Sequence, residues 1–335
     1  MRPKFVLTAL VILSVSSVAS ADYSTPGAGT SYTLADLAQI APEVVQQETD
    51  FNFRILDKLT IAASDELKIF DSFVTMATRQ SVKLGWNSTD DFMPIIEIEG
   101  RIQAGNTIFR ADVSSEYENA PHALVLRTSQ SDQPSGVIED CTFERFFTAI
   151  TARHPGQVFI NSCRFNECYS IGVHAFQESH VEISDCVFYN CAAVSAEGTV
   201  KIRNCRAEGG GITLSSIGQG SEIADNVLIG PGQFGLLVVG TVTPTVERCQ
   251  ISGFQYGLIV EGSGEAQFES NSIWGNRYGA VLFTDYARIR MRRNQIVHNT
   301  AEILDAKGAV SMPAICIDLN ATVDLGTTSS PGFNI

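Results

Sequence analysis

The sequence lacks a long internal hydrophobic run, an excess of basic residues and any metal-binding cysteine pattern. A membrane-spanning helix needs about 20 predominantly apolar residues, so we expect no membrane span. The eight cysteines include no Cys-x-x-Cys pair, and no Cys/His cluster has zinc-ligand spacing, so we expect no metal site. The 23 Lys and Arg are outnumbered by 37 Asp and Glu. Because an acidic surface repels phosphate, nucleic acid and anionic lipid are excluded as expected partners.

The first 21 residues have the features of an export signal. Arg2 and Lys4 form a positive start, residues 5–18 are mostly apolar, and Ala19-Ser20-Ala21 resembles a cleavage site. We therefore expect a signal peptide over residues 1–21 and a secreted or periplasmic mature chain.

One sequence motif recurs eight times between Val137 and Ala309: an apolar residue, two further residues, a Cys or Asn, one residue, and a second apolar residue. The Cys/Asn positions are Cys141, Cys163, Cys186, Cys205, Asn226, Cys249, Asn271 and Asn294, with spacings of 22, 23, 19, 21, 23, 22 and 23 residues. A fixed period in this range is typical of a solenoid, in which each unit is stable only against its neighbours.

The composition of each repeat indicates short strands separated by bends. Three strands and three bends in each repeat predict an all-β fold, a right-handed parallel β-helix of about 10–12 coils in which Ile stacks on Ile and Phe on Phe. The recurring Asn is expected to adopt the left-handed conformation and to hydrogen-bond its counterpart on the next coil, with Cys filling the same slot as a buried thiol. Cys168 and Cys191 share a second slot and are the pair we expect to form a disulfide.

Four segments are predicted along the chain. Residues 1–21 are the signal, 22–50 are a linker and an N-terminal capping helix, 51–309 are the β-helix with regular coils over 137–309, and 310–335 are a C-terminal tail or cap. The helix is expected to begin at a capping box, Thr33-Leu34-Ala35-Asp36. Whether residues 51–136 continue the same stack is left open by their irregular spacing.

The apolar-x-x-Cys/Asn-x-Phe/Ile motif, followed by strands such as Gly257-Leu258-Ile259, resembles the bacterial secreted right-handed parallel β-helix repeat proteins with a pectate-lyase-like fold. That resemblance is to a member of uncharacterised function, because the group includes lyases, hydrolases, epimerases and adhesins. It implies that any active site lies on the outward side chains of one strand stack. It also implies calcium as a cofactor if the chain is a lyase; otherwise no cofactor is expected. The hydrolase motifs of the group are missing, apart from an isolated Asp90-Asp91.

The outward positions of the early regular coils contain a candidate catalytic group. Arg153, His154 and His174 are expected to lie together, with Glu197 about one coil away. Such a group could act as a general base or hold a carboxylate-bearing sugar. The alternative is a solvated arginine with surface histidines.

Further outward positions are candidate binding residues: Phe176, Leu237, Ile259, Phe283, Arg288 and Arg290. The apolar members form either a binding stripe or a face covered by the C-terminal tail. The arginines belong to an alternating run that either binds an anionic ligand or solubilises the last coil.

Three functions remain open from the sequence. The leading hypothesis is an exported binding module for a polysaccharide or another cell-surface component. The second is a polysaccharide lyase or related sugar-acting enzyme that uses Arg153, His154, His174 and Glu197, and the third is a structural or adhesive rod. The sequence does not define the oligomeric state.

Overall fold

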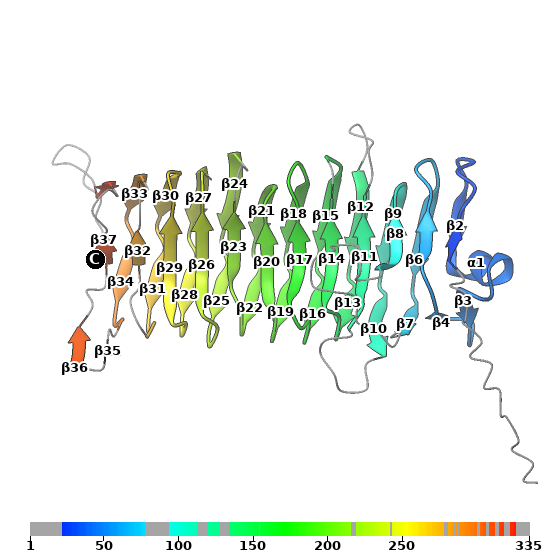
Figure 1. Cartoon of the computed structure of the whole chain (residues 1–335), viewed down its shortest axis with the longest axis horizontal. Coiled ribbons are helices and arrows are strands. Elements are labelled where there is room, and N and C mark those ends of the chain that lie inside the picture. The colour runs from blue at the N-terminus through cyan, green and yellow to red at the C-terminus, as the bar shows by residue number, and fades with distance from the viewer. Residues whose placement is uncertain are drawn as a thin grey trace, which may run out of the picture.

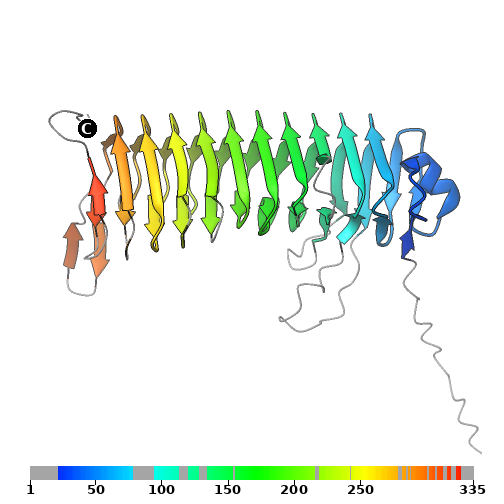
Figure 2. The ribbon, with the colours of Figure 1, turned by 90° about the horizontal axis from the view of Figure 1, so that it is seen from above.

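The computed structural model describes residues 22–77, 94–112, 120–127, 134–153, 155–215, 219–241, 243–277, 281–283, 286, 288–299, 302–305, 308–311, 315–317 and 322–325. Side chains are described throughout these ranges except at 94–95, 134–135, 219, 281–283 and 302–322. Within these residues the chain forms three 12-stranded sheets that wind around a common axis, which confirms the predicted right-handed parallel β-helix. Figures 1 and 2 show the coils stacked in chain order.

Sheet A carries the candidate site. Its strands, in order, are β1 (Tyr23–Ser24), β5 (Leu59–Ile61), β8 (Pro94–Ile98), β11 (His122–Leu126), β14 (Thr148–Ala152), β17 (Ile171–Ala175), β20 (Ala192–Ala196), β23 (Ile212–Ser215), β26 (Phe234–Val239), β29 (Tyr256–Glu261), β32 (Val281–Phe283) and β37 (Ile315–Ile317).

Sheets B and C form the other two sides of the coil. Sheet B contains β2 (Ser31–Thr33), β6 (Glu66–Phe70), β9 (Arg101–Gly105), β12 (Pro134–Glu139), β15 (Gln157–Asn161), β18 (His180–Ser184), β21 (Thr199–Arg203), β24 (Gln219–Ala224), β27 (Thr243–Glu247), β30 (Glu265–Glu269), β33 (Arg288–Arg292) and β38 (Thr322–Asp324). Sheet C contains β3 (Val45–Gln47), β4 (Asn52–Ile55), β7 (Phe73–Ala77), β10 (Ile108–Asp112), β13 (Thr142–Glu144), β16 (Arg164–Asn166), β19 (Val187–Tyr189), β22 (Arg206–Glu208), β25 (Val227–Ile229), β28 (Gln250–Ser252), β31 (Ser272–Trp274) and β34 (Gln295–Val297).

The stack extends beyond the predicted 51–309 range at both ends. Strands β1 and β2 join sheets A and B before residue 51, and β37 and β38 pair with β32 and β33 after residue 309. Strands β4 to β11 belong to the same three sheets, so the described residues between 51 and 136 continue the stack. Strands β35 (Glu302–Asp305) and β36 (Gly308–Ser311) form a separate antiparallel pair.

Helix α1 (Leu34–Ile40) closes the N-terminal end of the stack (Figure 1). Its N-cap is Thr33, whose hydroxyl accepts a hydrogen bond from the backbone N–H of Asp36, while the Asp36 carboxylate accepts from the backbone N–H of Thr33. The predicted capping box is therefore confirmed. Leu34 and Leu37 are buried against the first coil, which would otherwise present unpaired strand groups.

Stacked side chains fill the inside of the helix. The rings of Phe109, Phe143, Phe165 and Phe188 lie on one another with centroid separations of 4.9, 5.3 and 4.6 Å along the series. Adjacent parallel strands are about 4.8 Å apart, so in-register coils place like side chains in van der Waals contact.

The bends before the recurring Cys or Asn have the same backbone conformation on successive coils. The residue before each recurring Cys or Asn has a positive φ, as at Asp140 (51°), Asp185 (54°) and Asp225 (59°). The prediction that the recurring Asn itself is left-handed is wrong. The preceding residue makes the turn, and Asp and Asn tolerate that conformation better than most residues. The recurring residue is then directed into the buried interior.

Buried asparagines pair with the next coil, as expected. The amide group of Asn271 donates from Nδ2 to Oδ1 of Asn294 at 2.9 Å, and Oδ1 of Asn271 accepts the backbone N–H of Cys249 at 2.9 Å. Asn276 and Asn299 form a second pair of this kind five residues further on. These bonds satisfy backbone groups at bends that the sheet hydrogen bonds do not reach.

The cysteines with described side chains are free and buried, including Cys168 and Cys191, so the disulfide expected between these two is not formed. Their neighbours in the first slot use sulfur as a weak hydrogen-bonding group. The backbone N–H of Cys163 donates to Sγ of Cys186 at 3.3 Å, and the Cys186 thiol donates to the carbonyl oxygen of Ser184 at 3.1 Å. Burial raises the pKa of the Cys249 thiol to about 11, which keeps it protonated and unreactive.

The hydrogen bonds between buried asparagines of adjacent coils, here called the asparagine ladder, give a testable prediction at Asn271. Asn271→Ala removes the acceptor for the Cys249 N–H and the donor to the carbonyl oxygen of Val246. Each orphaned buried group costs about 1–3 kcal/mol, so chemical denaturation should show a large fall in the free energy of unfolding. Asn271→Cys is the matched control, because Cys occupies this slot in other coils. An equal fall in the free energy of unfolding for both variants would contradict the stabilising role of the Asn271 hydrogen bonds.

Candidate functional site

Two columns of outward side chains run across the N-terminal half of sheet A. In the first, the register aligns Glu97, Val125, Thr151, His174 and Ser195 on successive coils. The register also aligns the next residue of each strand: Leu126, Ala152, Ala175 and Ala196. The second column consists of the residues that come directly after these four: Arg127, Arg153, Phe176 and Glu197. Successive members are about 4.8 Å apart along the helix axis, so charged and aromatic groups from separate coils meet on one face.

A buried carboxylate anchors one end of this face. Glu97 is 2% exposed and forms ion pairs with Lys58 and with Arg127, whose Nε lies 2.6 Å from Oε1. A carboxylate removed from water requires such partners, because an unpaired buried charge is strongly destabilising. Glu97 therefore fixes two cations on the outer surface of sheet A.

Arg153 and His174 meet over an aromatic ring. The Arg153 guanidinium carbon lies 4.6 Å from the centroid of the Phe176 ring, and the His174 ring centroid lies 4.0 Å from the same ring with a tilt of 32°. The arginine–ring geometry is that of a cation–π contact. Phe176 therefore orients the arginine and the histidine together.

Two histidines beside Arg153 are held neutral. Burial, and then the positive charge of Arg153, lower the pKa of His174 to about 4. The same two causes, with a contribution from His174, lower the pKa of His122 to about 4. Both imidazoles are therefore uncharged at neutral pH and each keeps one nitrogen lone pair as an acceptor.

Thr151 lies in the same column as His174 and precedes it by one coil. It is 2% exposed, and its Oγ1 has no hydrogen-bond partner among the described residues.

The structure brings together part of the predicted catalytic group. Arg153 and His174 are neighbours, and Phe176, predicted as a binding residue, contacts both. Glu197 follows Phe176 in its column, so it is one coil from His174 and two coils from Arg153. His154 lies outside the described residues.

Sequence reasoning missed Lys58, Glu97, His122 and Arg127. All four belong to the coils before residue 137, where irregular spacing hides which residues share a column. A usable signal was present in Ile96-Glu97-Ile98 and Leu124-Val125-Leu126-Arg127, because a residue that alternates with buried ones must face outward.

The predicted apolar stripe is only partly available to a ligand. Leu237 is half-buried on the outer face, but Ile259 is 3% exposed and offers a ligand almost no surface. The Phe283 side chain lies outside the described part of the chain. Its backbone pairs in register with Val260 of the core, so the residue that the register aligns with outward Ile259 is Leu282 rather than Phe283.

The predicted arginine run lies on a different face. Arg288 and Arg290 are exposed on β33 of sheet B. Arg288 pairs with Glu265 at 3.0 Å, and the neighbouring Arg292 pairs with Asp324 at 2.5 Å. Ion pairs along this strand favour the solubilising interpretation, and Arg288 and Arg290 are on a different sheet from the Arg153 site.

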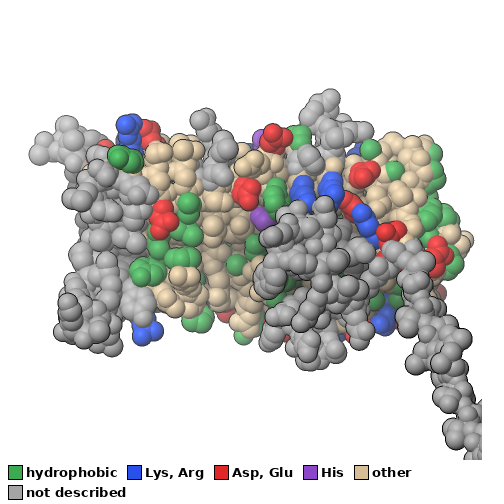
Figure 3. Space-filling model, viewed as in Figure 1, with side chains coloured by type: hydrophobic (Ala, Val, Ile, Leu, Met, Phe, Trp, Pro, Cys, Tyr) green, Lys and Arg blue, Asp and Glu red, His purple; other side chains and the backbone are tan. Residues whose placement is uncertain are grey.

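Among the described residues, one part of the sheet A face gathers three cations on an acidic protein. Lys58 and Arg127 pair with Glu97, and Arg153 adds a further cation, whereas the chain as a whole has a formal charge of −14. Figure 3 shows blue side chains and a purple histidine close together on this face. Such a cluster attracts anions locally even when the net charge is negative.

No helix among the described residues is long and apolar enough to cross a membrane. Within the same residues, no group of three or more His, Cys, Asp or Glu is arranged to hold a metal ion.

The family model described as "Right handed beta helix region" matches residues 102–251 and 192–323. These matches span more than half of the sequence, and the chain belongs to this right-handed β-helix family. No curated protein matched in a sequence comparison.

Solved structures share the architecture at low identity. A mutant of the periplasmic alginate epimerase AlgG has a TM-score of 0.55 and 12% identity, over 88% of this chain and 83% of that one. A double mutant of AlgG has a TM-score of 0.51 and 11% identity over 81% of this chain, which spans 64% of the AlgG chain. A DFA-IIIase from Arthrobacter chlorophenolicus A6, in complex with GF2, has a TM-score of 0.45 and 13% identity over 83% of this chain and 82% of its own. The likeness to AlgG shows the fold.

The charge of Arg153 should control the protonation of its neighbours. Arg153→Gln removes a positive charge beside His122 and His174, so the pKa of each imidazole should rise, while burial keeps both below the ordinary 6.5. Imidazole NMR signals followed against pH measure this shift. Arg164→Gln, on the outer side of sheet C, is the control and should leave both values unchanged. Equal titration curves in wild type and Arg153→Gln would contradict the arrangement.

The same pKa values predict how stability depends on pH. Because the folded-state pKa of about 4 lies below the ordinary value of 6.5, the unfolded chain binds more protons between these limits. The contribution of neutral His174 is therefore present above pH 6.5 and is lost as the pH falls toward 4. Urea denaturation of His174→Gln across this range should show a shallower pH dependence than wild type. An unchanged slope would show that His174 is not buried as described.

Proposed function

We propose that this protein binds an anionic polysaccharide across the outer face of sheet A, with a carboxylate of the sugar at Arg153. The observation that carries the proposal is the cluster of Lys58, Arg127 and Arg153, in which Lys58 and Arg127 pair with the same carboxylate, that of Glu97. Arginine is well suited to a carboxylate because its planar guanidinium can donate two parallel hydrogen bonds.

The surroundings of Arg153 suit a sugar rather than a bare anion. Phe176 offers a half-buried ring, and the neutral imidazole of His174, which is also half-buried, offers a polar group for a hydroxyl. Ligand sites commonly combine apolar and aromatic surface with a few placed polar groups. The AlgG structures are named for an alginate epimerase, which makes polyuronates the first ligands to test.

A location outside the cytoplasm, where such polymers occur, is part of the same proposal. It rests on the predicted signal over residues 1–21. Cell fractionation of the full chain, with N-terminal sequencing of the mature form, tests it.

Binding should depend on Arg153 and on salt. Isothermal titration with oligomers of alginate and of polygalacturonate should show binding that weakens as ionic strength rises. Arg153→Ala should weaken it about tenfold or more, because a hydrogen bond to a charged group contributes about 1.5–3 kcal/mol. Arg288→Ala, an exposed arginine on sheet B, is the matched control and should bind as wild type does. No binding of either oligomer, or equal losses in the two variants, would overturn the proposal.

A second candidate function is β-elimination on the bound uronate, as in a polysaccharide lyase. A base takes the proton beside the carboxylate, a C=C bond forms as the glycosidic C–O bond breaks, and the departing oxygen gains a proton from water. The observation that favours it is a neutral imidazole, His174, packed beside Arg153 on one ring. A carboxylate bound at Arg153 would offset the positive charge that lowers the pKa of His174 and make it a better base. In this role Arg153 would stabilise the charge that develops on the sugar.

Ultraviolet absorbance of unsaturated products separates binding from lyase activity. Incubation with the two polyuronates, with and without calcium, should produce absorbance in wild type and none in His174→Gln if the second function holds. Binding without any product would leave the binding function alone. Of the three sequence-based hypotheses, a purely structural rod is favoured only if neither binding nor product is found.

A further inference from the structure

We propose that the outer face of sheet C carries a second binding site, for an uncharged oligosaccharide. This face lies on a different side of the coil from the Arg153 site, and the proposal does not depend on the function of sheet A.

One outward column of sheet C defines the surface. The register aligns Glu144, Asn166 and Tyr189 on successive coils. The same column continues through Glu208, Ile229 and Ser252 to Trp274. At about 4.8 Å per coil, Tyr189 and Trp274 are about 19 Å apart along the axis.

The two aromatic side chains of this column are unusually exposed. Tyr189 and Trp274 are each 47% exposed, although large rings usually bury most of their surface. The column positions between them are not aromatic, so the two rings form separate contact points on one straight track. An extended oligomer lying along the axis could contact both.

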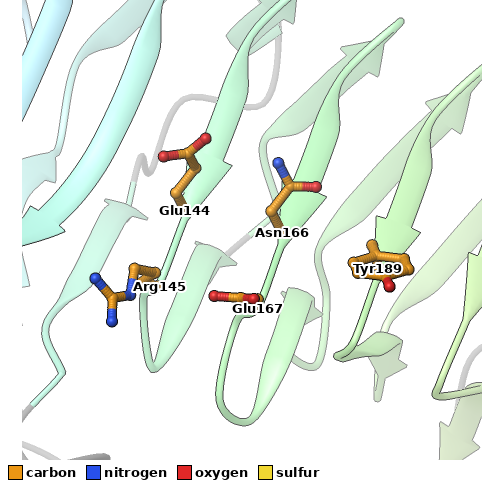
Figure 4. Close-up of a pocket in the computed structure, with 5 residues that line it drawn as sticks. All are labelled: Glu144, Arg145, Asn166, Glu167 and Tyr189. Carbon is orange, nitrogen blue, oxygen red and sulfur yellow. The ribbon is translucent and has the colours of Figure 1, made fainter. Parts of the chain in front are cut away.

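A hollow of about 340 Å³ adjoins the first ring. It is lined by Glu144, Arg145, Asn166, Glu167 and Tyr189, and Figure 4 shows three of these on adjacent strands with Arg145 and Glu167 at the following bends. The volume lies at the lower end of the range for small-molecule sites, about 300–1,000 Å³. The hollow therefore combines an aromatic wall with amide, carboxylate and guanidinium groups.

The charges of this face are largely paired with one another. Arg110 Nε lies 2.5 Å from the Glu144 carboxylate, and Arg206 lies 2.5 Å from Glu208. The remaining lining charges, Arg145 and Glu167, are of opposite sign. Within the hollow and its ion pairs, cations and carboxylates are thus balanced, and the exposed Arg164 adds one further cation on this face. The hollow itself therefore does not select an anion.

Balanced charges and an open aromatic ring suit hydroxyl-rich, uncharged rings. The carboxylates and the Asn166 amide can accept or donate hydrogen bonds to hydroxyl groups. Tyr189 and Trp274 can cover the less polar faces of sugar rings and exclude water from them. An anionic sugar would be repelled by Glu144 and Glu167 about as strongly as it is attracted by the neighbouring arginines, which makes the uncharged class the better match.

The test is titration calorimetry of the full chain with four uncharged hexasaccharides: cellohexaose, maltohexaose, mannohexaose and chitohexaose. At least one should bind, and Tyr189→Ala and Trp274→Ala should each weaken that binding about tenfold or more, as truncation of a central interface aromatic does. Tyr189→Phe should retain most of the affinity, because it keeps the ring.

Two control variants establish whether the sugar binds at this column. Phe51→Ala removes a ring that is 63% exposed outside the column and should leave binding unchanged. Arg153→Ala should also leave it unchanged, whether or not sheet A binds polyuronate. Thermal unfolding checks that each variant folds. Failure of all four sugars to bind, or binding that survives both Tyr189→Ala and Trp274→Ala, would overturn the proposal.

Discussion

The proposed binding surfaces of this protein depend on coils whose strands pair in register. Backbone hydrogen bonds between parallel strands fix the height of each coil, and buried pairs such as Asn271 and Asn294 fix its bends. Because side chains alternate between the two faces of a strand, a slip of one residue would exchange inside for outside. The stacked Phe143 and Phe165 rings oppose such a slip by filling the interior. The register of the strands therefore determines which side chains face outward and which of them are neighbours on the outer surface.

The same repeat produces outer faces with different chemistry. Inside, successive coils need nearly the same residues, and the core accepts little variation in volume. Outside, each position is free to vary, so charge and aromatic groups can differ from sheet to sheet. Sheet A collects cations around Glu97 and Arg153, whereas sheet C pairs its charges and exposes Tyr189 and Trp274. A β-helix with a repeated interior can in this way have outer faces whose chemistry differs from sheet to sheet.

The sequence predicted the architecture well because the interior repeats. The Cys/Asn period and the Phe positions follow directly from stacking, and the structure confirms both. The left-handed residue was assigned one position too late, because the repeat marks the buried slot and the turn occurs just before it. The outer site was recovered only in part. Arg153 and His174 lie in regular coils and could be aligned, but Glu97 lies in irregular coils, where spacing does not reveal its column. Ion pairing and burial of outer side chains depend on three-dimensional contacts that no period encodes.

The central claim is tested most directly by a crystal structure of the full chain with a uronate hexasaccharide. We expect ordered sugar along sheet A, with a carboxylate within hydrogen-bond distance of the Arg153 guanidinium and a sugar ring beside Phe176. Sugar bound instead against Arg288 and Arg290 on sheet B, or over Tyr189 on sheet C, would contradict the assignment of the anionic site.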